Sequence, residues 1–457
     1  MRAPASPRPR GADRVERGGV DRGEGAHARA EALGAGQAAF PAATGETGLR
    51  VLWVVDPEFA AARHHGGVMR YLAYARELVA RGHQVWFMVN DATGDGAEKR
   101  RHLEALVREG ALTGFFPVRY APPRTRRRVA SWLGHPPAGN RLLRAEQSAA
   151  TAQLQAVVEQ EAIDACIFSD RELLFALPDV ARRVPALIDW CDCFVLYLAR
   201  LLGRHARRGA LTPLPGVARY LAQTALLERH YGRRADANLV VSPVDKRWLD
   251  TLNGRPEANR VLLNGVRAGP PPRVERVPGR LVFSGNMDFP PNVEAAVWFI
   301  DRVLPHILRR RPDVTFVVAG ANPVAEVRAR AGRHVHVTGF VDDMAAELAR
   351  GSLYVAPLLS GGGFKNKVME AIAAGTFVVA TPIAAEFLPA AARAQLVVAD
   401  GAIPLAEAVL EVLGVPGRYA PRLAALRAMV EREFDWGRRA DELAALVREC
   451  VAARAPA

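Results

Sequence analysis

The sequence predicts an α/β protein made of two doubly wound, Rossmann-like domains with helices at its C-terminal end. From Arg50 onward, short apolar runs alternate with longer helical segments, which is typical of a parallel sheet covered by crossover helices. A proline-rich stretch at 268–279 interrupts this alternation, which then resumes. A chain of 457 residues is long enough for two or three domains.

The first domain is predicted over residues 49–267. Its strands are the β-branched and aromatic runs at 51–55, 84–90, 163–169, 186–189 and 238–242, and its helices include 68–81, 141–161 and 216–231. Residues 1–48 are rich in Ala, Gly, Pro and Arg and have almost no large apolar residues. We expect this tail to be disordered, because it cannot bury enough apolar surface to fold.

The linker at 268–279 leads into a second domain, predicted over residues 280–435. Its strands are the nearly continuous apolar runs at 281–285, 315–320, 334–339, 353–357, 377–381 and 395–399. Such runs indicate strands that are covered on both faces. Helices are predicted at 419–433 and 436–451, and the C-terminal helical segment, 436–457, is expected to pack back on the first domain.

A glycine run opens a helix within residues 360–381, which read SGGGFKNKVMEAIAAGTFVVAT. Gly361, Gly362 and Gly363 let backbone N–H groups approach an anion closely, and the helix start adds unpaired donors and the positive end of its dipole. Lys365 and Lys367 are two of only four lysines in the chain, and an ammonium group suits phosphate oxygens. The segment therefore predicts a site for a diphosphate.

Lys367 and Glu370 share one face of this otherwise apolar helix, at positions i and i+3. A charged pair on a mostly buried helix must either pair internally or meet a ligand. Both interpretations stay open at this level. In an open α/β sheet, ligands bind beyond the carboxyl ends of the strands, so we expect the loops after Gly285, Gly320 and Gly339 to converge on the same crevice.

The formal net charge of +13 comes from arginine. The arginine runs lie on several elements and lack interleaved aromatic residues, so no nucleic-acid site is predicted. The run RTRRR at 124–128 is the best candidate for contact with a membrane surface. No stretch of about 18 apolar residues could span a bilayer. We expect a cytoplasmic protein, with peripheral contact to the inner face of the plasma membrane.

Cysteine is scarce, and its spacing matches no zinc or redox motif. Cys166, Cys191, Cys193 and Cys450 are the four cysteines, and we expect free thiols in a reducing compartment. No Asp and His cluster has the spacing of metal ligands, so neither a metal nor a cofactor is predicted.

Several segments together resemble family 4 of the glycosyltransferases, the group 1 glycosyl transferases of the GT-B class. They are SGNMDFPPNVEAAVWFIDRVLP (284–305), HVHVTGFVDDM (334–344), NKVMEAIAAGTFVVAT (366–381), and VSPVDKRWL (241–249) followed by NGV (264–266). The resemblance covers most of residues 50–453. It implies two Rossmann-like domains that face each other across a cleft, and a retaining, metal-independent, hexosyltransferase-like enzyme of polysaccharide biosynthesis.

The resemblance also implies site residues in this chain. Lys367 would meet the diphosphate of a nucleotide-sugar donor, and Glu370 would meet ribose or sugar hydroxyls. The other residues implied at the donor are Gly66, Gly67, Gly285, Asn286, Phe340, Val341, Gly361, Gly362, Gly363, Lys365 and Asn366. Gly66 and Gly67 could equally serve only to open the helix that follows them. The acceptor would lie on the first domain.

Three departures from the family pattern stand out. Gly362 replaces the first glutamate of E-x7-E, and Asn286 to Asp288 replace an arginine and lysine usually found after the first strand of the second domain. Lys365 is a hypothetical substitute for that charge. In the first domain, Ser169, Asp170 and Arg171 replace a histidine.

Candidate acceptor-side residues follow from the strand ends of the first domain. Asp170 is a candidate catalytic residue, and Arg171, Asp189 and Asp192 are candidate acceptor contacts. Helix capping is an alternative role for the aspartates.

The leading hypothesis is transfer of a sugar from a nucleotide-diphosphate sugar to a glycan, lipid-linked or small-molecule acceptor. One alternative is a catalytically silent GT-B binding or scaffold protein, suggested by Gly362 and by the missing arginine and lysine. A sugar-nucleotide epimerase on the same fold is a further alternative.

Overall fold

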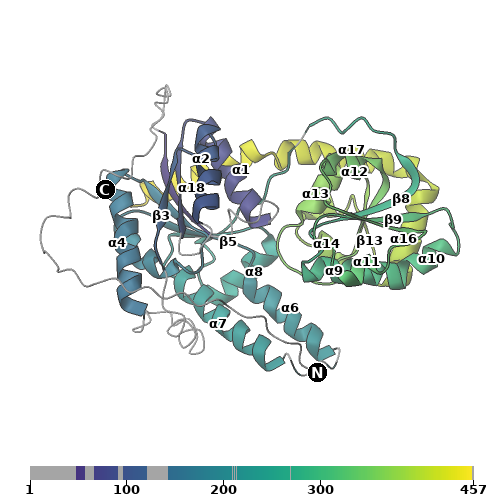
Figure 1. Cartoon of the computed structure of the whole chain (residues 1–457), viewed down its shortest axis with the longest axis horizontal. Helices are drawn as coiled ribbons and strands as arrows, with labels where there is room; N and C mark the ends of the chain where they lie inside the picture. Colours follow the sequence, from purple (N-terminus) through teal and green to yellow (C-terminus); the bar gives the residue numbers. More distant parts are fainter. Residues whose placement is uncertain are drawn as a thin grey trace, which may run out of the picture. The chain divides into compact units, whose positions relative to one another are not determined.

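The computed structural model describes residues 48–56, 66–90, 96–120, 143–207, 209, 212, 214–267 and 269–454. Within these ranges the named strands form two parallel sheets with helices on their faces (Figure 1). The predicted tail at 1–48 lies outside the described residues except for Gly48, and the RTRRR run lies outside them entirely.

The first sheet has seven strands, in the order β3-β2-β1-β4-β5-β6-β7. Its strands are β1 (Arg50–Val55), β2 (Gln84–Asn90), β3 (Gly114–Val118), β4 (Ala165–Phe168), β5 (Ala186–Cys191), β6 (Ala237–Val240) and β7 (Asn259–Val261). The helices of this part are α1 (Gly66–Ala80), α2 (Gly96–Arg108), α4 (Arg144–Gln160), α5 (Leu177–Val180), α6 (Phe194–Arg207), α7 (Leu214–Gly232) and α8 (Pro243–Asn253), with a 3-10 turn at Leu174–Ala176.

The second sheet has six strands, in the order β10-β9-β8-β11-β12-β13. They are β8 (Val277–Ser284), β9 (Thr315–Ala319), β10 (Val335–Gly339), β11 (Gly351–Ala356), β12 (Val378–Ala380) and β13 (Val397–Val398). The helices are α9 (Pro290–Trp298), a π-helical turn (Phe299–Val303), α10 (Leu304–Leu308), α11 (Ala325–Arg328), α12 (Met344–Arg350), α13 (Asn366–Ala373), α14 (Pro382–Ala385), α15 (Ala390–Arg393), α16 (Ala402–Gly414) and α17 (Pro416–Glu433). Figure 1 shows α9 and α11 on one side of this sheet and α12 and α13 on the other.

Both sheets confirm the predicted doubly wound architecture. In each, the strand that comes first in the sequence lies at the centre, the next two lie on one side of it and the later ones on the other. The order therefore reverses between β1 and β4 in the first sheet, and between β8 and β11 in the second. These are the switch points at which ligands bind in this architecture.

The apolar strand runs are buried on both faces, as expected for parallel strands. In the first sheet, Trp53 and Val55 belong to one core cluster and Leu52 and Val54 to another, because successive side chains point to opposite faces. The second sheet has its own core, which includes Phe283, Phe316 and the inner side of α13.

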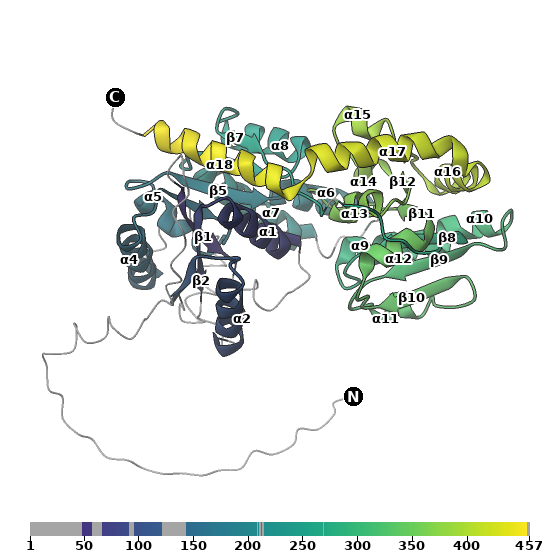
Figure 2. The same cartoon turned by 90° about the horizontal axis from the view of Figure 1, so that it is seen from above.

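The last helix, α18 (Trp436–Ala452), contributes to the core of the first sheet. Its residues Ala440, Leu443 and Val447 belong to the same cluster as Trp53, and the ring of Trp436 lies 5.3 Å from that of Tyr74 on α1. Figure 2 shows α18, in yellow, beside α1.

Several elements differ from the sequence prediction: β3 and β7 were not predicted, and other bounds shift by a few residues. β8 begins at Val277, inside the predicted linker, because Val277 pairs with Gly351 of β11 and extends the ladder. β13 has only two residues instead of the five predicted, since it is the edge strand and pairs with β12 over Val397 and Val398 alone.

Candidate functional site

The glycine loop, residues 360–365, lies at the switch point of the second sheet. It follows β11 and leads into α13, and Gly285 and Asn286 follow β8, the neighbouring strand. The structure therefore brings the two most distinctive sequence motifs of this half to the same edge of one sheet. The loop after β10, which contains Phe340 and Val341, belongs to that edge as well.

The ammonium group of Lys367 lies beside Gly285, the residue that follows β8. Its Nζ donates a hydrogen bond to Oδ1 of Asn292 at 2.5 Å and lies 4.8 Å from the centre of the Phe283 ring. Burial lowers the pKa of Lys367 to about 7, and the charge of Glu370 opposes this shift. An ammonium ion held among so few oxygen acceptors is well suited to receive an anion.

Glu370 lies one turn further along α13. Its side chain is exposed, although protein surrounds it closely enough that desolvation raises the pKa of its carboxyl. Among the described residues, no ion pair joins Glu370 to Lys367. The internal pairing that the sequence left open is thus not formed, and the carboxylate remains accessible to a ligand.

Gly285 explains how Lys367 reaches the end of β8. A Cβ atom on Gly285 would lie 2.7 Å from both Nζ of Lys367 and Nδ2 of Asn292, and its φ is 153°. Any side chain at this position would therefore displace the ammonium group. Lys367 occupies this region from α13, in a chain that lacks the arginine and lysine that the family resemblance implies after β8.

Lys365 lies elsewhere, so it does not replace the charge missing after β8. Its side chain is 6% exposed, and its Nζ donates to the carbonyl oxygens of Gly362 at 2.5 Å and Gly363 at 2.8 Å. Burial lowers the pKa of Lys365, while Asp192, Glu386 and Asp245 favour the charged form.

Asparagine residues connect the loops around Lys367. Nδ2 of Asn292 donates to the carbonyl oxygen of Asn286 at 2.8 Å, and Nδ2 of Asn322 donates to Oδ1 of Asn286 at 3.3 Å. Sequence reasoning missed Asn292 and Asn322. The signal for Asn292 was its place in the first turn of the helix after Gly285, where a polar side chain can reach the strand end.

Phe340 and Val341 follow β10 directly. The side chain of Phe340 is 58% exposed. Val341 is half-buried and packs against the core of the second sheet. The loop thus presents an aromatic ring and backbone groups at the same edge as Gly285.

Asp170 lies at the switch point of the first sheet, just beyond the end of β4. Its Oδ1 accepts a hydrogen bond from the backbone N–H of Glu172 at 2.8 Å, which is a local turn contact. Its Oδ2 is buried and has no hydrogen-bond partner. Desolvation by burial raises the pKa of Asp170 to about 8, so this carboxyl is mostly protonated at pH 7.

Arg171 and Asp192 lie near the same strand ends. The guanidinium group of Arg171 pairs with Oε1 of buried Glu228 at 3.1 Å and lies over the rings of Trp190 and Phe194. Asp192 is half-buried beside the glycine loop, since a Cβ on Gly363 would fall 1.7 Å from its Oδ1. Burial raises the pKa of Asp192, and the charge of Lys365 opposes that shift.

Asp189 has partners within the protein. Its Oδ2 accepts from Nε of Arg70 at 2.8 Å, and neither side chain is exposed. Arg70 also donates to Oδ1 of Asn264 at 2.5 Å, and Nδ2 of Asn264 donates to Oδ1 of Asn366 at 3.0 Å. Sequence reasoning missed Arg70 and Asn264, although a lone arginine on the apolar side of α1 was a signal for a buried partner.

Gly66 and Gly67 are the first residues of α1, and His64 and His65 lie outside the described residues. The opening of the helix by glycine is thus observed, and contact with a ligand stays a prediction.

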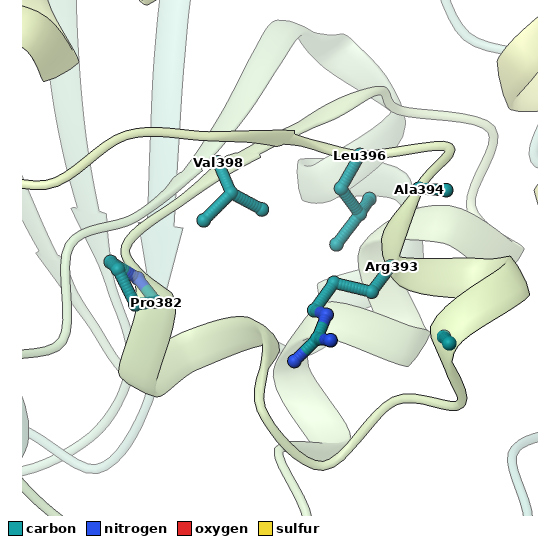
Figure 3. A pocket seen from close by; sticks show the side chains of 6 residues that line it. Pro382, Arg393, Ala394, Leu396 and Val398 are labelled. Carbon is teal, nitrogen blue, oxygen red and sulfur yellow. The ribbon is translucent and has the colours of Figure 1, made fainter.

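A hollow lies in the second sheet's part of the chain, near β13. It is lined by Pro382, Ala390, Arg393, Ala394, Leu396 and Val398 (Figure 3). None of the predicted site residues belongs to it.

Other sequence expectations concern thiols, metals and membranes. Cys166, Cys191, Cys193 and Cys450 are free thiols. Within the described ranges, no three His, Cys, Asp or Glu side chains cluster so that they could hold a metal ion. No described helix combines the length and the hydrophobicity needed to cross a bilayer.

Comparison with known families confirms the resemblance found in the sequence. The family described as "Glycosyl transferases group 1" matches residues 278–414, a range that contains Gly285, the glycine loop, Lys367 and Glu370. Phosphatidyl-myo-inositol mannosyltransferase of Mycolicibacterium smegmatis is 30% identical over 221 residues, which are 46% of this chain and 56% of that protein. The chain spans only 36% to 56% of the length of the first curated relatives it matches.

Solved structures share the fold at low sequence identity. Sucrose-phosphate synthase from Thermosynechococcus elongatus superposes with a TM-score of 0.64 at 14% identity, over 89% of this chain and all of that one. HepE from Anabaena, in a complex with UDP, gives a TM-score of 0.60 at 14% identity, over 88% of this chain and 100% of that one. These likenesses confirm the predicted GT-B fold with its two Rossmann-like sheets.

Proposed function

We propose that this chain, which contains a group 1 glycosyltransferase domain at residues 278–414, transfers a sugar from a nucleotide-diphosphate sugar to a glycan, lipid-linked or small-molecule acceptor. In this proposal residues 280–435 bind the donor and residues 49–267 bind the acceptor. The reaction retains the anomeric configuration and requires no metal ion.

The observation that supports donor binding most directly is the position of Lys367. Its buried ammonium lies at the switch point, has one side-chain hydrogen-bond partner among the described residues, and follows the glycine loop by two positions. An anion beside it would offset its desolvation and would favour the protonated form. The N–H groups at the start of α13 add donors that a diphosphate can accept.

Departure of the nucleotide diphosphate places growing negative charge on the phosphate oxygens. Lys367 and the amide donors stabilise that charge from fixed positions, so little reorganisation is needed in the transition state. Glu370, exposed one turn away, accepts hydrogen bonds from ribose or sugar hydroxyls. The exposed ring of Phe340 and the backbone of Val341 lie where the base would bind.

A carboxylate lies near the glycine loop even though Gly362 replaces the usual glutamate. Asp192 belongs to the segment after β5, and its Oδ1 would clash with a Cβ on Gly363. We infer that Asp192 can orient hydroxyl groups of the donor or of the acceptor.

Asp170 is the proposed acceptor-side group. Because its carboxyl is mostly protonated at pH 7, its Oδ2 can donate a hydrogen bond to an acceptor oxygen, and only the ionised form of Asp170 could take the proton of an acceptor hydroxyl. Arg171 lies next to it in the chain. Asp189 is not available for this role, since Arg70 and the backbone N–H of Cys191 engage its oxygens.

The names of the matched proteins indicate which acceptors and donors to test first. The mycobacterial relative is named for a phosphatidyl-myo-inositol acceptor, so lipid-linked acceptors at the inner face of the plasma membrane come first. The UDP complex of HepE makes UDP-sugars the first donors to test.

Thermal-shift screening with UDP, GDP, ADP and TDP sugars tests donor binding. A ligand at about 100 times its dissociation constant should stabilise the protein by ~2.7 kcal/mol. Lys367→Ala should abolish this shift, whereas the matched control Lys246→Ala should keep it, because Lys246 pairs with Asp250 on α8. An unchanged shift in Lys367→Ala would remove Lys367 from the site.

Hydrolysis and transfer assays with the donor that binds then test the activity. Glu370→Gln should lower turnover and leave the melting temperature of the free protein close to that of the wild type. Binding without turnover on any acceptor would instead identify a binding protein of the same fold.

A further inference from the structure

Lys365 and Lys367 are separated by one residue and lie in different surroundings. The ammonium of Lys367 faces Asn292 and the end of β8. The ammonium of Lys365 faces the carbonyl oxygens of its own loop. The two lysines of this motif thus have different hydrogen-bond partners.

The hydrogen bonds of Lys365 determine how the peptide groups of the glycine loop are oriented. A trans peptide is planar, so the carbonyl of one residue and the N–H of the next point in opposite directions. Because the carbonyls of Gly362 and Gly363 point toward Nζ of Lys365, the N–H groups of Gly363 and Phe364 point away from it.

In the chain, these N–H groups directly precede the start of α13. Among the described residues, the backbone N–H groups from Gly361 to Phe364 donate to no protein acceptor. Successive N–H groups that point the same way form a concave anion-binding surface. Lys365 lies on the carbonyl side of these peptide groups, opposite their N–H groups.

Three carboxyl groups act on the buried ammonium of Lys365, whose pKa is lowered by desolvation. Asp192 and Asp245, from the first sheet's part of the chain, and Glu386 after α14 favour its protonated form against desolvation. Asp192 also lies so close to the loop that only glycine fits at position 363, where φ is +69°. The loop is therefore held from one side by an internal cation and an adjacent carboxylate.

We propose that Lys365 is a positioning residue, which holds the glycine loop with its amide N–H groups toward the diphosphate without touching the ligand. This inference rests on the proposed function, because it assumes that the loop binds a diphosphate. It assigns Lys365 a role different from the donor contact that the sequence predicted.

Three variants test the proposal, with pyrophosphate and UDP as ligands in isothermal titration calorimetry. Lys365→Met removes both the charge and the hydrogen-bond donors, and it should weaken pyrophosphate binding at least tenfold. Lys365→Gln keeps neutral N–H donors for the loop carbonyls, so its affinity should lie between those of Lys365→Met and the wild type. Lys246→Met is the matched control, because it removes a lysine on α8 that is paired with Asp250. It should bind pyrophosphate like the wild type.

Amide hydrogen exchange over residues 360–366 provides a readout that a general loss of stability would not reproduce. Pyrophosphate should slow exchange at these amides in the wild type and in Lys246→Met, and should not slow it in Lys365→Met. Exchange in the core strands of the second sheet should be alike in all of these proteins.

Several outcomes would overturn the proposal. Pyrophosphate binding by Lys365→Met within twofold of the wild type would contradict it. Binding by Lys365→Gln as weak as that of Lys365→Met would indicate direct contact by the charge. If neither Lys365 variant folds, the residue is a folding requirement and not a positioning residue. Failure of the wild type to bind any of these ligands would instead overturn the proposed function itself.

Discussion

The two sheets share one strand order, yet their switch points differ in charge. In the second sheet, Lys367 presents an ammonium group at the end of β8, and amide donors of the glycine loop lie nearby. In the first sheet, Asp170 presents a buried carboxyl after β4, and the cation Arg70 on α1 is paired with Asp189 of β5. The same backbone topology therefore supports one basic and one acidic site, and the side chains at the strand ends decide which is formed.

The largest expected effect comes from replacing each buried cation by methionine. Arg70→Met leaves Asp189 buried without its partner, so it should lower the free energy of unfolding by about 3–5 kcal/mol. Lys367→Met removes a cation that burial disfavours, so it should leave stability within ~1 kcal/mol of the wild type or raise it. Urea unfolding at pH 7 measures both. Equal losses in the two variants would mean that both cations are structural.

The next effect concerns the place where Asp192 meets the glycine loop. Gly363→Ala should lose about 1–3 kcal/mol, because the residue has a left-handed backbone and no space for a methyl group. Gly362→Ala should change stability by less than ~0.5 kcal/mol, since a Cβ there would lie 4.0 Å from Oδ1 of Asp245. Thermal unfolding of the two variants compares them directly, and similar losses would argue against the close approach of Asp192.

The pH dependence of donor binding tests the ammonium of Lys367. In the free protein its pKa is about 7, so the charge is present below pH 7 and is lost as the pH rises. Affinity for a nucleotide sugar should therefore fall above pH 7, by up to about tenfold per pH unit for one proton. Lys367→Arg, which stays charged, should show a flatter profile in the same calorimetric titration. A flat profile in the wild type would contradict the assignment.

The lowered pKa of Lys367 also makes the stability of the folded protein depend on pH, in the opposite direction to the affinity for the donor. The folded-state pKa of Lys367 lies below its ordinary value of 10.5, so between about pH 7 and 10.5 the unfolded chain binds a proton that the folded protein does not. The contribution of this group to stability therefore rises with pH across that window.

The last prediction concerns Asp170→Asn, whose effect on stability depends on pH. The pKa of Asp170 is raised from 3.8 to about 8, so between these values the folded state holds a proton that the unfolded state releases, and stability falls as the pH rises. Asn cannot ionise, so the variant should be more stable relative to the wild type at pH 7 than at pH 4. Urea unfolding at the two pH values measures this difference. A loss at pH 7 would indicate an ionised, hydrogen-bonded carboxylate.

Local patterns in the chain predicted the parts of the site that depend on neighbours in sequence. The strands, the glycine loop and the placement of Lys367 at a carboxyl edge all follow from runs of fewer than about ten residues, because strand and helix periodicity is a local property. The same patterns could not separate the task of Lys365 from that of Lys367, since both are lysines at the start of one helix.

The tertiary structure decided which polar groups meet. Lys367 and Asn292 are 75 residues apart in the chain, and Arg70 and Asp189 are 119 apart, so no local pattern relates them. Burial then sets the consequences, because a desolvated charge must find a partner or change its pKa. The amino-acid order was enough to predict two doubly wound sheets and an anion-binding loop. Packing between distant segments placed the ammonium of Lys367 where a ligand can reach it and paired Asp189 with Arg70 inside the protein.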